Sequence, residues 1–261
     1  MHTEPLKQLA RLIEQSNRIV FFGGAGVSTE SGIPDFRSAS GLYHLPRSPE
    51  QPAGPAPVWA AYPPEEILSH HFFTENPEAF FAFYRSHMVY AQARPNQAHL
   101  CLADLEKQDR IEAIITQNID GLHQDAGSRK VLELHGSVRR NTCLRCRRPF
   151  SLADILDQPG VPHCPCGGLI KPDVVLYEES LDERVLAQSV QALRHADLLL
   201  IGGTSLRVYP AAGLVDYYTG GPSVLINRSE TPLDGQVTLA IHGSIGEVLA
   251  AACGPATTQL V

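Results

Sequence analysis

Short apolar runs, each bounded by glycine or polar residues, recur along the chain and are typical of buried strands. They occupy residues 18–22, 111–116, 131–134, 197–201 and 223–226. Helices are predicted over residues 3–16, 96–108, 181–195 and 244–252. Because the strands are apolar on both faces, the pattern predicts an α/β fold in which helices cover both faces of a parallel sheet.

A polar or glycine-rich cluster follows each of these five strands. The clusters are Gly24 to Ser28, Gln117 to Asp120, His135-Gly136, Gly202 to Ser205, and Asn227. Ligands of parallel sheets bind at the carboxyl ends of the strands, so these clusters predict one shared binding site. The first cluster indicates a phosphate or pyrophosphate, because glycines after a strand let the backbone approach a ligand and offer N–H groups. By spacing alone this signal is weak, since Thr29 stands where a dinucleotide fingerprint has its third glycine. The alternative is a tight turn that binds nothing.

Two unusual segments lie between the first strand and residue 93. Residues 44–64 are proline-rich, which excludes helix and central strand and predicts a long surface loop, either a passive spacer or a lid. Residues 65–92 are rich in phenylalanine and tyrosine. Asn76-Pro77 predicts a helix start there, with Asn as the cap. We interpret the aromatic residues as the core of a small helical module, with a substrate wall as the alternative.

Four cysteines are spaced as a metal site. Cys143 and Cys146 form one close pair, and Cys164 and Cys166 form the second. Such pairs predict a four-thiolate zinc site, which is structural because its coordination sphere is closed. The second pair has one intervening residue instead of two, and His163 is an alternative ligand. Unpaired thiols are the other interpretation. The neighbouring arginines favour a solvated surface over nucleic-acid contact. Cys101 and Cys253 are expected to be buried thiols.

Composition narrows the class of protein. The 261 residues are 43% hydrophobic and 19% charged, which excludes a largely disordered chain. The net charge of −7 disfavours general nucleic-acid binding. No apolar run approaches the length of a membrane span, and the first residues lack the order of a secretory signal, so a cytoplasmic location is expected.

Taken together, these motifs resemble the sirtuins, which are NAD-dependent protein lysine deacylases. The resemblance runs in order over nearly the whole chain and is closest to compact bacterial members. It is carried by residues 24–37, Gln117-Asn118-Ile119-Asp120, His135-Gly136, the two cysteine pairs, Lys171-Pro172-Asp173-Val174-Val175, Gly203-Thr204-Ser205 and Asn227. The resemblance implies a discontinuous Rossmann-like NAD-binding domain (residues 1–38, 93–140 and 171–261). It also implies a small domain made of a cofactor loop with the helical module (39–92) and a zinc-binding module (141–170).

The resemblance further implies the chemistry. The acyl oxygen of an acylated lysine, in a protein or peptide partner, attacks the nicotinamide ribose of NAD. The products are nicotinamide, O-acyl-ADP-ribose and free lysine. His135 matches the general base, and an imidazole suits that role. Asn118 and Asp120 complete the catalytic set, and Phe36 shields the reacting centre. The other implied NAD-binding residues are Gly24, Ala25, Gly26, Ser28, Thr29, Arg37, Gln117, Ile119, Gly203, Thr204, Ser205, Asn227 and Ile245.

Substrate binding is implied for two further groups of residues. Val174, Val175 and Leu176 would pair with the substrate peptide as a strand. Tyr84 and His87 match the Tyr-x-x-Arg that selects negatively charged acyl groups in some sirtuins. Because the arginine is absent, we expect acetyl or other uncharged acyl groups in preference to succinyl. Tyr177-Glu178-Glu179 also replaces the more familiar Phe-Gly-Glu.

Two other functions stay open at this point. A mono-ADP-ribosyltransferase would use the same activated ribose, and a non-catalytic NAD sensor or zinc-dependent scaffold would need no base. The presence of Asn118, Asp120 and His135 argues against the sensor. The oligomeric state and the protein substrate are not indicated by the sequence.

Overall fold

The computed structural model describes residues 3–36, 38, 41–44 and 57–254. Its larger part is a six-stranded sheet in which every neighbouring pair is parallel, in the order β3-β2-β1-β7-β8-β9. The strands are β1 (Ile19–Gly23), β2 (Ile111–Thr116), β3 (Val131–Glu133), β7 (Leu198–Gly202), β8 (Ser223–Asn227) and β9 (Leu239–His242). The order runs outward in both directions from β1, so the chain crosses over near the centre of the sheet, where ligands of such folds bind.

Helices pack on both faces of this sheet. One face is covered by α1 (Thr3–Gln15), α5 (Gln97–Lys107) and α9 (Ile245–Cys253), and the other by α8 (Glu183–His195) and the 3-10 helix η5 (Ala211–Tyr217). Successive side chains of β1 point to opposite faces of the sheet. Phe21 packs in the core with α1, α5 and α9, and Phe22 packs in the core with α8 and η5. Both rings are fully buried. The short helix α6 (Leu122–Asp125) follows β2.

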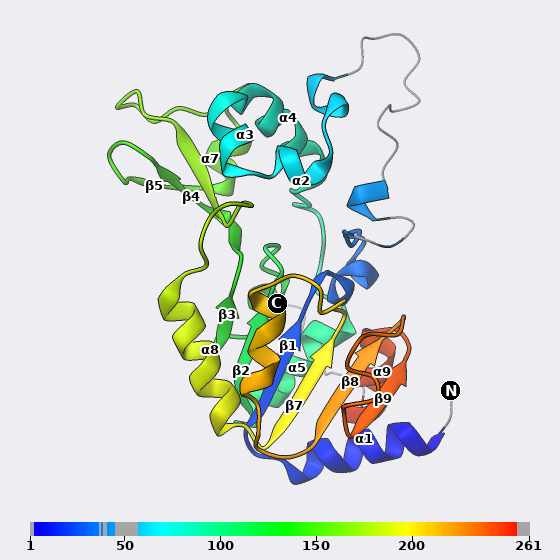
Figure 1. Cartoon of the computed structure of the whole chain (residues 1–261). Helices are drawn as coiled ribbons and strands as arrows, with labels where there is room; N and C mark the ends of the chain where they lie inside the picture. The colour runs from blue at the N-terminus through cyan, green and yellow to red at the C-terminus, as the bar shows by residue number, and fades with distance from the viewer. Residues whose placement is uncertain (1–2, 37, 39–40, 45–56, 255–261) are drawn as a thin grey trace.

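A second, smaller assembly lies at one end of the molecule (Figure 1). It contains the antiparallel sheet β5-β4-β6, built from β4 (Gly136–Cys143), β5 (Pro149–Ser151) and β6 (Ile170–Val174). Helices α2 (Pro64–Ile67), α3 (His70–Glu75), α4 (Pro77–His87) and α7 (Leu152–Leu156) share one apolar core with this sheet. That core holds the phenylalanines of residues 65–92 and Tyr84, so their interpretation as core is confirmed, whereas Tyr90 lies outside it.

The predicted α/β architecture is confirmed, and the predicted strands and helices match the observed ones to within about two residues. Asn96 caps α5 and Asp182 caps α8 through their side chains, which explains where these helices begin. Asn76 precedes α4 as expected, but its side chain makes no capping hydrogen bond. None of the helices in the described part of the chain has the length and apolar character needed to span a bilayer.

Three expectations need correction or lie outside the description. The proline-rich stretch falls mostly on residues 45–56, which are outside the described residues. Its last part is not loop, because residues Val58–Ala61 form the 3-10 helix η4 and α2 begins at Pro64, where proline is tolerated. Cys253 is exposed at the end of α9, whereas Cys101 is buried as expected.

Candidate functional site

A cavity of about 550 Å³ lies where the carboxyl ends of the central strands meet the smaller assembly. Residues from nearly every predicted cluster line it, whereas Tyr84 does not and Arg37 lies outside the described residues. The predicted site residues in its wall are Gly24, Ala25, Gly26, Ser28, Thr29, Phe36, His87, Gln117, Asn118, Ile119, Asp120, His135, Val174, Val175, Leu176, Gly203, Thr204, Ser205, Asn227 and Ile245.

A chain of side-chain hydrogen bonds joins the ends of β1 and β2. The Asn118 amide donates to Ser28 Oγ at 3.1 Å, and Ser28 Oγ donates to Asp120 Oδ2 at 2.7 Å. Asp120 Oδ1 accepts from the backbone N–H of Leu122 at 2.8 Å, at the start of α6. Asn118 is buried, and Thr116 Oγ1 accepts a hydrogen bond from its backbone N–H at 3.0 Å. These contacts hold the amide and the carboxylate in fixed positions at the cavity wall.

His135 occupies the turn between β3 and β4. Its Nδ1 lies 2.9 Å from the backbone carbonyl oxygen of Gln117, which can only accept a hydrogen bond. Nδ1 therefore carries the proton and Nε2 keeps its lone pair. Burial lowers the pKa of His135 below its ordinary value, although the hydrogen bond to Gln117 acts in the opposite direction. The ring is consequently neutral at pH 7, which is the form that accepts a proton.

Gly136, the next residue, explains why the chain can turn there. Its φ is 74°, and a Cβ atom at this position would lie 1.9 Å from the carbonyl oxygen of Asp173. Only glycine fits such a close approach, which brings β4 against β6 directly beside His135.

The N–H groups of two glycines after β1 form hydrogen bonds within the protein. The N–H of Gly24 donates to Gly202 O at 3.2 Å, and the N–H of Gly26 donates to Gly203 O at 2.8 Å. Cβ atoms at Gly24 and Gly26 would lie 2.8 Å from atoms of Thr204 and Gly203. The expectation that these two N–H groups face a ligand is wrong. The glycines allow the turns after β1 and β7 to pack backbone against backbone.

The ends of β2, β7 and β8 complete the wall. Gln117 Nε2 donates to Thr204 Oγ1 at 3.1 Å, and the same oxygen accepts from the backbone N–H of Leu206 at 3.2 Å. Asn227 Nδ2 donates to the backbone oxygen of Ser229 at 2.8 Å. Ile245, at the start of α9, is 3% exposed and lines the cavity with its apolar side chain.

The two residues predicted to select the acyl group lie in different environments. Tyr84 is 1% exposed and its ring packs against Phe80 and Phe81 of α4. Burial also raises the pKa of Tyr84. His87 does line the cavity, with its ring stacked on Phe83 and edge-on to Trp59, both at 4.8 Å between centroids. Burial lowers the pKa of His87, which keeps this ring neutral at pH 7.

The backbone after β6 is already engaged at the positions expected to pair with a peptide. The N–H of Val175 donates to His135 O at 3.0 Å, and that of Leu176 to Glu179 Oε2 at 2.9 Å. The N–H of Tyr177 donates to Leu68 O at 2.9 Å. The side chains of Val174, Val175 and Leu176 line the cavity, but strand addition through the N–H groups of Val175 and Leu176 would first have to break these bonds.

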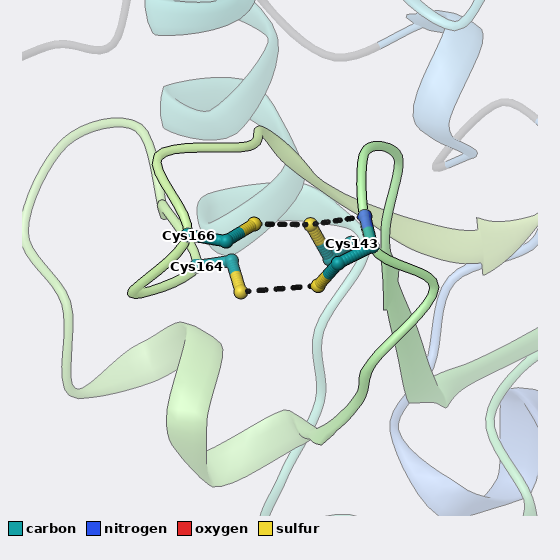
Figure 2. A group of neighbouring side chains, drawn as sticks. Cys143, Cys164 and Cys166 are labelled. Carbon is teal, nitrogen blue, oxygen red and sulfur yellow. Dashed lines mark hydrogen bonds between the residues drawn. The ribbon is translucent and has the colours of Figure 1, made fainter.

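The four cysteines gather into one cluster. Their sulfur atoms all lie within 4.8 Å of one another, with Cys143 Sγ 3.5 Å from Cys166 Sγ and Cys146 Sγ 3.6 Å from Cys164 Sγ. Figure 2 shows the sulfur atoms of Cys143, Cys164 and Cys166 turned toward a common centre. Zn–S bonds of about 2.3 Å in a tetrahedron require sulfur atoms roughly 3.8 Å apart, so the cluster fits one zinc ion. His163, the alternative ligand, is not part of this cluster, and its Nδ1 lies 2.9 Å from Val161 O.

Several lining residues were not predicted. Ile33, Met88 and Tyr90 add apolar surface, and Arg228 and Glu230 extend the wall beyond Asn227. The last two lie within three residues of the end of β8 and could have been included by the rule for strand ends. The sequence carries no signal for Met88 and Tyr90, which follow the end of α4 and line the cavity only through the tertiary fold.

Comparisons with known proteins agree with this geometry. The model of the Sir2 family matches residues 24–210. An "NAD-dependent protein deacetylase" from Clostridium perfringens (strain 13 / Type A) is 52% identical over 248 residues, covering 94% of this chain and 97% of its own. A protein of the same description from Cutibacterium acnes is 53% identical over 245 residues, covering 94% of this chain and 96% of its own.

Solved structures give the same result. A structure described as Sir2 with a p53 peptide and NAD+ has a TM-score of 0.78 and 38% identity, covering 94% of this chain and 95% of its own. A Sir2 variant with a deacetylated p53 peptide and 3'-O-acetyl ADP ribose has a TM-score of 0.82 and 37% identity, covering 94% and 96%. On sequence, fold and site geometry together, the chain belongs to the Sir2 family.

Proposed function

We propose that this protein is an NAD-dependent protein lysine deacylase that acts on acylated lysine in proteins or peptides. The observation that carries the proposal is His135. It is a neutral imidazole fixed through Nδ1 by Gln117 O, its Nε2 has no hydrogen-bond partner among the described residues, and it lines the same cavity as Asn118 and Asp120. NAD, when bound, supplies a ribose with a good leaving group at its anomeric carbon. The chain supplies the base and the groups that orient the sugar.

The roles of the neighbouring residues follow from their contacts. Asn118 and Asp120 are linked through Ser28, so an amide and a carboxylate face the cavity as a single rigid unit. Such a unit orients ribose hydroxyls and a carboxamide through hydrogen bonds, and its pre-organisation lowers the entropic cost of reaching the reactive geometry. Phe36 lies edge-on to Tyr43, with 5.7 Å between ring centroids, and adds an apolar wall that excludes water.

Uncharged acyl groups fit the wall contributed by the smaller assembly. Leu68, His87, Met88 and Tyr90 line the cavity there, and none of these four is a cation when His87 is neutral. A carboxylate on the acyl chain would find no guanidinium at His87 to form the bidentate pair that arginine provides. Acetyl is therefore preferred to succinyl.

One zinc ion held by Cys143, Cys146, Cys164 and Cys166 has a structural role in this proposal. Four thiolates leave no open coordination position for a water or a substrate. Cys143 is also part of the apolar core shared by the smaller sheet and α2–α4, so metal binding contributes to the stability of that core.

The test is an assay of deacetylation of an acetyl-lysine peptide. The release of nicotinamide and the formation of O-acetyl-ADP-ribose are measured as the readouts. His135→Ala should lower kcat by about 10²- to 10⁴-fold, the usual contribution of a general base. His195→Ala, an exposed histidine on α8, is the matched control and should keep full activity. In a plot of kcat/KM against pH, the loss of activity on the acid side should begin below pH 6.5, because the pKa of His135 is lowered. Unchanged deacetylation by His135→Ala would refute the assignment. Transfer of label from NAD to protein without deacetylation would instead identify an ADP-ribosyltransferase.

A further inference from the structure

Glu178 adopts a backbone conformation that side chains rarely occupy. It follows β6 by four residues, lines the cavity, and is exposed at its edge. Its φ is 75°, in the left-handed region that favours glycine because a Cβ atom crowds the following carbonyl. A glutamate kept in such a conformation beside a substrate cavity is a reason to look for a function of its side chain.

The main-chain groups of Glu178 differ from the N–H groups of the three preceding residues in their hydrogen bonding. Val175, Leu176 and Tyr177 all donate their N–H groups within the protein. Within the described part of the chain, no hydrogen bond engages the N–H or C=O of Glu178. An extended segment entering the cavity can therefore form backbone hydrogen bonds here without displacing any existing one. This arrangement places Glu178 next to the bound segment.

The carboxylates of Glu178 and Glu179 differ in how they are neutralised. Glu179 pairs with Lys171 Nζ at 3.0 Å and His70 Nδ1 at 2.8 Å. Glu178 accepts one hydrogen bond, from the N–H of His71 at 2.9 Å, and forms no ion pair within the described residues. The amide holds the Glu178 side chain in place and leaves its negative charge uncompensated at the edge of the cavity.

We propose that Glu178 is a specificity-determining residue that selects acylated segments with a lysine or arginine within two residues of the acyl-lysine. This inference rests on the proposed function and names the class of its peptide substrate. The attraction is electrostatic, because a basic side chain beside an unpaired carboxylate gains an ion pair that glutamine cannot provide. Arg207, which is exposed on another segment of the cavity wall, would receive acidic side chains instead.

The experiment compares kcat/KM for acetyl-lysine peptides with arginine, glutamine or glutamate placed in turn at each flanking position. The wild-type protein should prefer arginine to glutamine by about two- to fivefold at one position, the range of an exposed ion pair, and the preference should shrink as salt is added. Glu178→Gln retains the acceptor for the His71 N–H and should reduce the ratio to about one. Glu75→Gln, on α3 but outside the cavity, is the matched control and should keep the wild-type ratio.

The outcomes separate this inference from the proposed function. An arginine preference that survives in Glu178→Gln, or is absent from the wild type at every position, overturns the role of Glu178. If no peptide is deacetylated, the proposed function fails, and the anisotropy of fluorescently labelled forms of the same peptides then measures the preference through binding alone. Glu178→Gly, which relaxes the backbone and removes the charge, provides a second variant and should also lose the preference.

Discussion

Lowering the pH from 7 to 5 should destabilise the protein through two buried histidines. His99 and His123 are 0% and 1% exposed, and their ring centroids lie 4.7 Å apart between α5 and α6. Burial lowers the pKa of His99 to about 4, against the opposing effect of the nearby carboxylates of Asp120 and Asp125. Burial, reinforced by His99, also lowers the pKa of His123 well below its ordinary value. Both rings are therefore neutral in the folded protein.

The direction and the size of this loss of stability follow from proton linkage. In the unfolded chain a histidine binds its proton as the pH falls through about 6.5, whereas the folded chain does not bind it. Stability is thus complete above pH 6.5 and falls as the pH is lowered. At pH 5, which is about 1.5 units below the pKa of a histidine in the unfolded chain, each histidine that stays neutral in the folded protein lowers the free energy of unfolding by about 2 kcal/mol, at about 1.36 kcal/mol per pH unit. Two such groups amount to a large share of the 5–15 kcal/mol that stabilises a typical protein.

The assay is urea unfolding of the zinc-loaded protein at pH 7 and pH 5, for wild type and His123→Leu. Neither ring nitrogen of His123 has a hydrogen-bond partner among the described residues, so leucine should fit this apolar site with little loss at pH 7. The variant should lose about 2 kcal/mol less than wild type between the two pH values. Protonation of the zinc thiolates affects both proteins and cancels in the difference.

Two further variants complete the experiment. His195→Gln, on the exposed side of α8, should reproduce the wild-type loss. His99→Gln should behave like His123→Leu, which keeps the test decisive if one of the two fails to fold. Equal losses in wild type and in both buried variants would refute the reasoning.

Three other predictions concern the zinc cluster, the edge of the cavity and the acyl group. Cys143→Ser should lose the zinc and lower the melting temperature, as measured by metal analysis and calorimetry; a metal-free variant of normal stability would contradict a structural ion. Tyr43 Oη and Tyr177 Oη form a hydrogen bond at 2.6 Å, so Tyr43→Phe and Tyr177→Phe should each raise KM for NAD by up to about tenfold, the effect of one hydrogen bond. The double variant should be no worse than either alone, and additive effects would show that the two hydroxyls act separately. Acetyl peptides should be deacylated faster than succinyl peptides, and His87→Arg should narrow the difference in rate; faster removal of succinyl by wild type would contradict the assignment.

Much of the site could be predicted because parallel sheets bring the ends of their strands together. The pair Asn118 and Asp120, the residue His135 and the residue Asn227 lie in three segments that are far apart in sequence, yet each segment follows a predicted strand. The apolar runs identify those strands, and the topology then places the residues that follow at one edge. The cysteine cluster was predictable for a similar reason, since two close pairs suffice to define a tetrahedral site.

Other features depended on contacts that no local pattern specifies. β4 and β6 carry many polar residues and are strands because they pair with each other, so their sequences gave no strand signal. The helical pattern of α4 does not reveal that Tyr84 faces the core while His87 reaches the cavity.

The sequence by itself determined the parallel sheet, the position of the binding edge and the metal-ligand set, because these follow from periodicity and spacing. Only the tertiary structure decided which hydrogen-bonding groups are left for a ligand. It assigns the N–H groups of Gly24 and Gly26 to the turn after β7, and it fixes the proton of His135 on Nδ1. Among the described residues, it also leaves the backbone N–H and C=O of Glu178 without a hydrogen bond and its carboxylate without an ion pair. The physical reason is that each donor or acceptor is used by whichever partner the fold brings within reach, and those partners are distant in sequence.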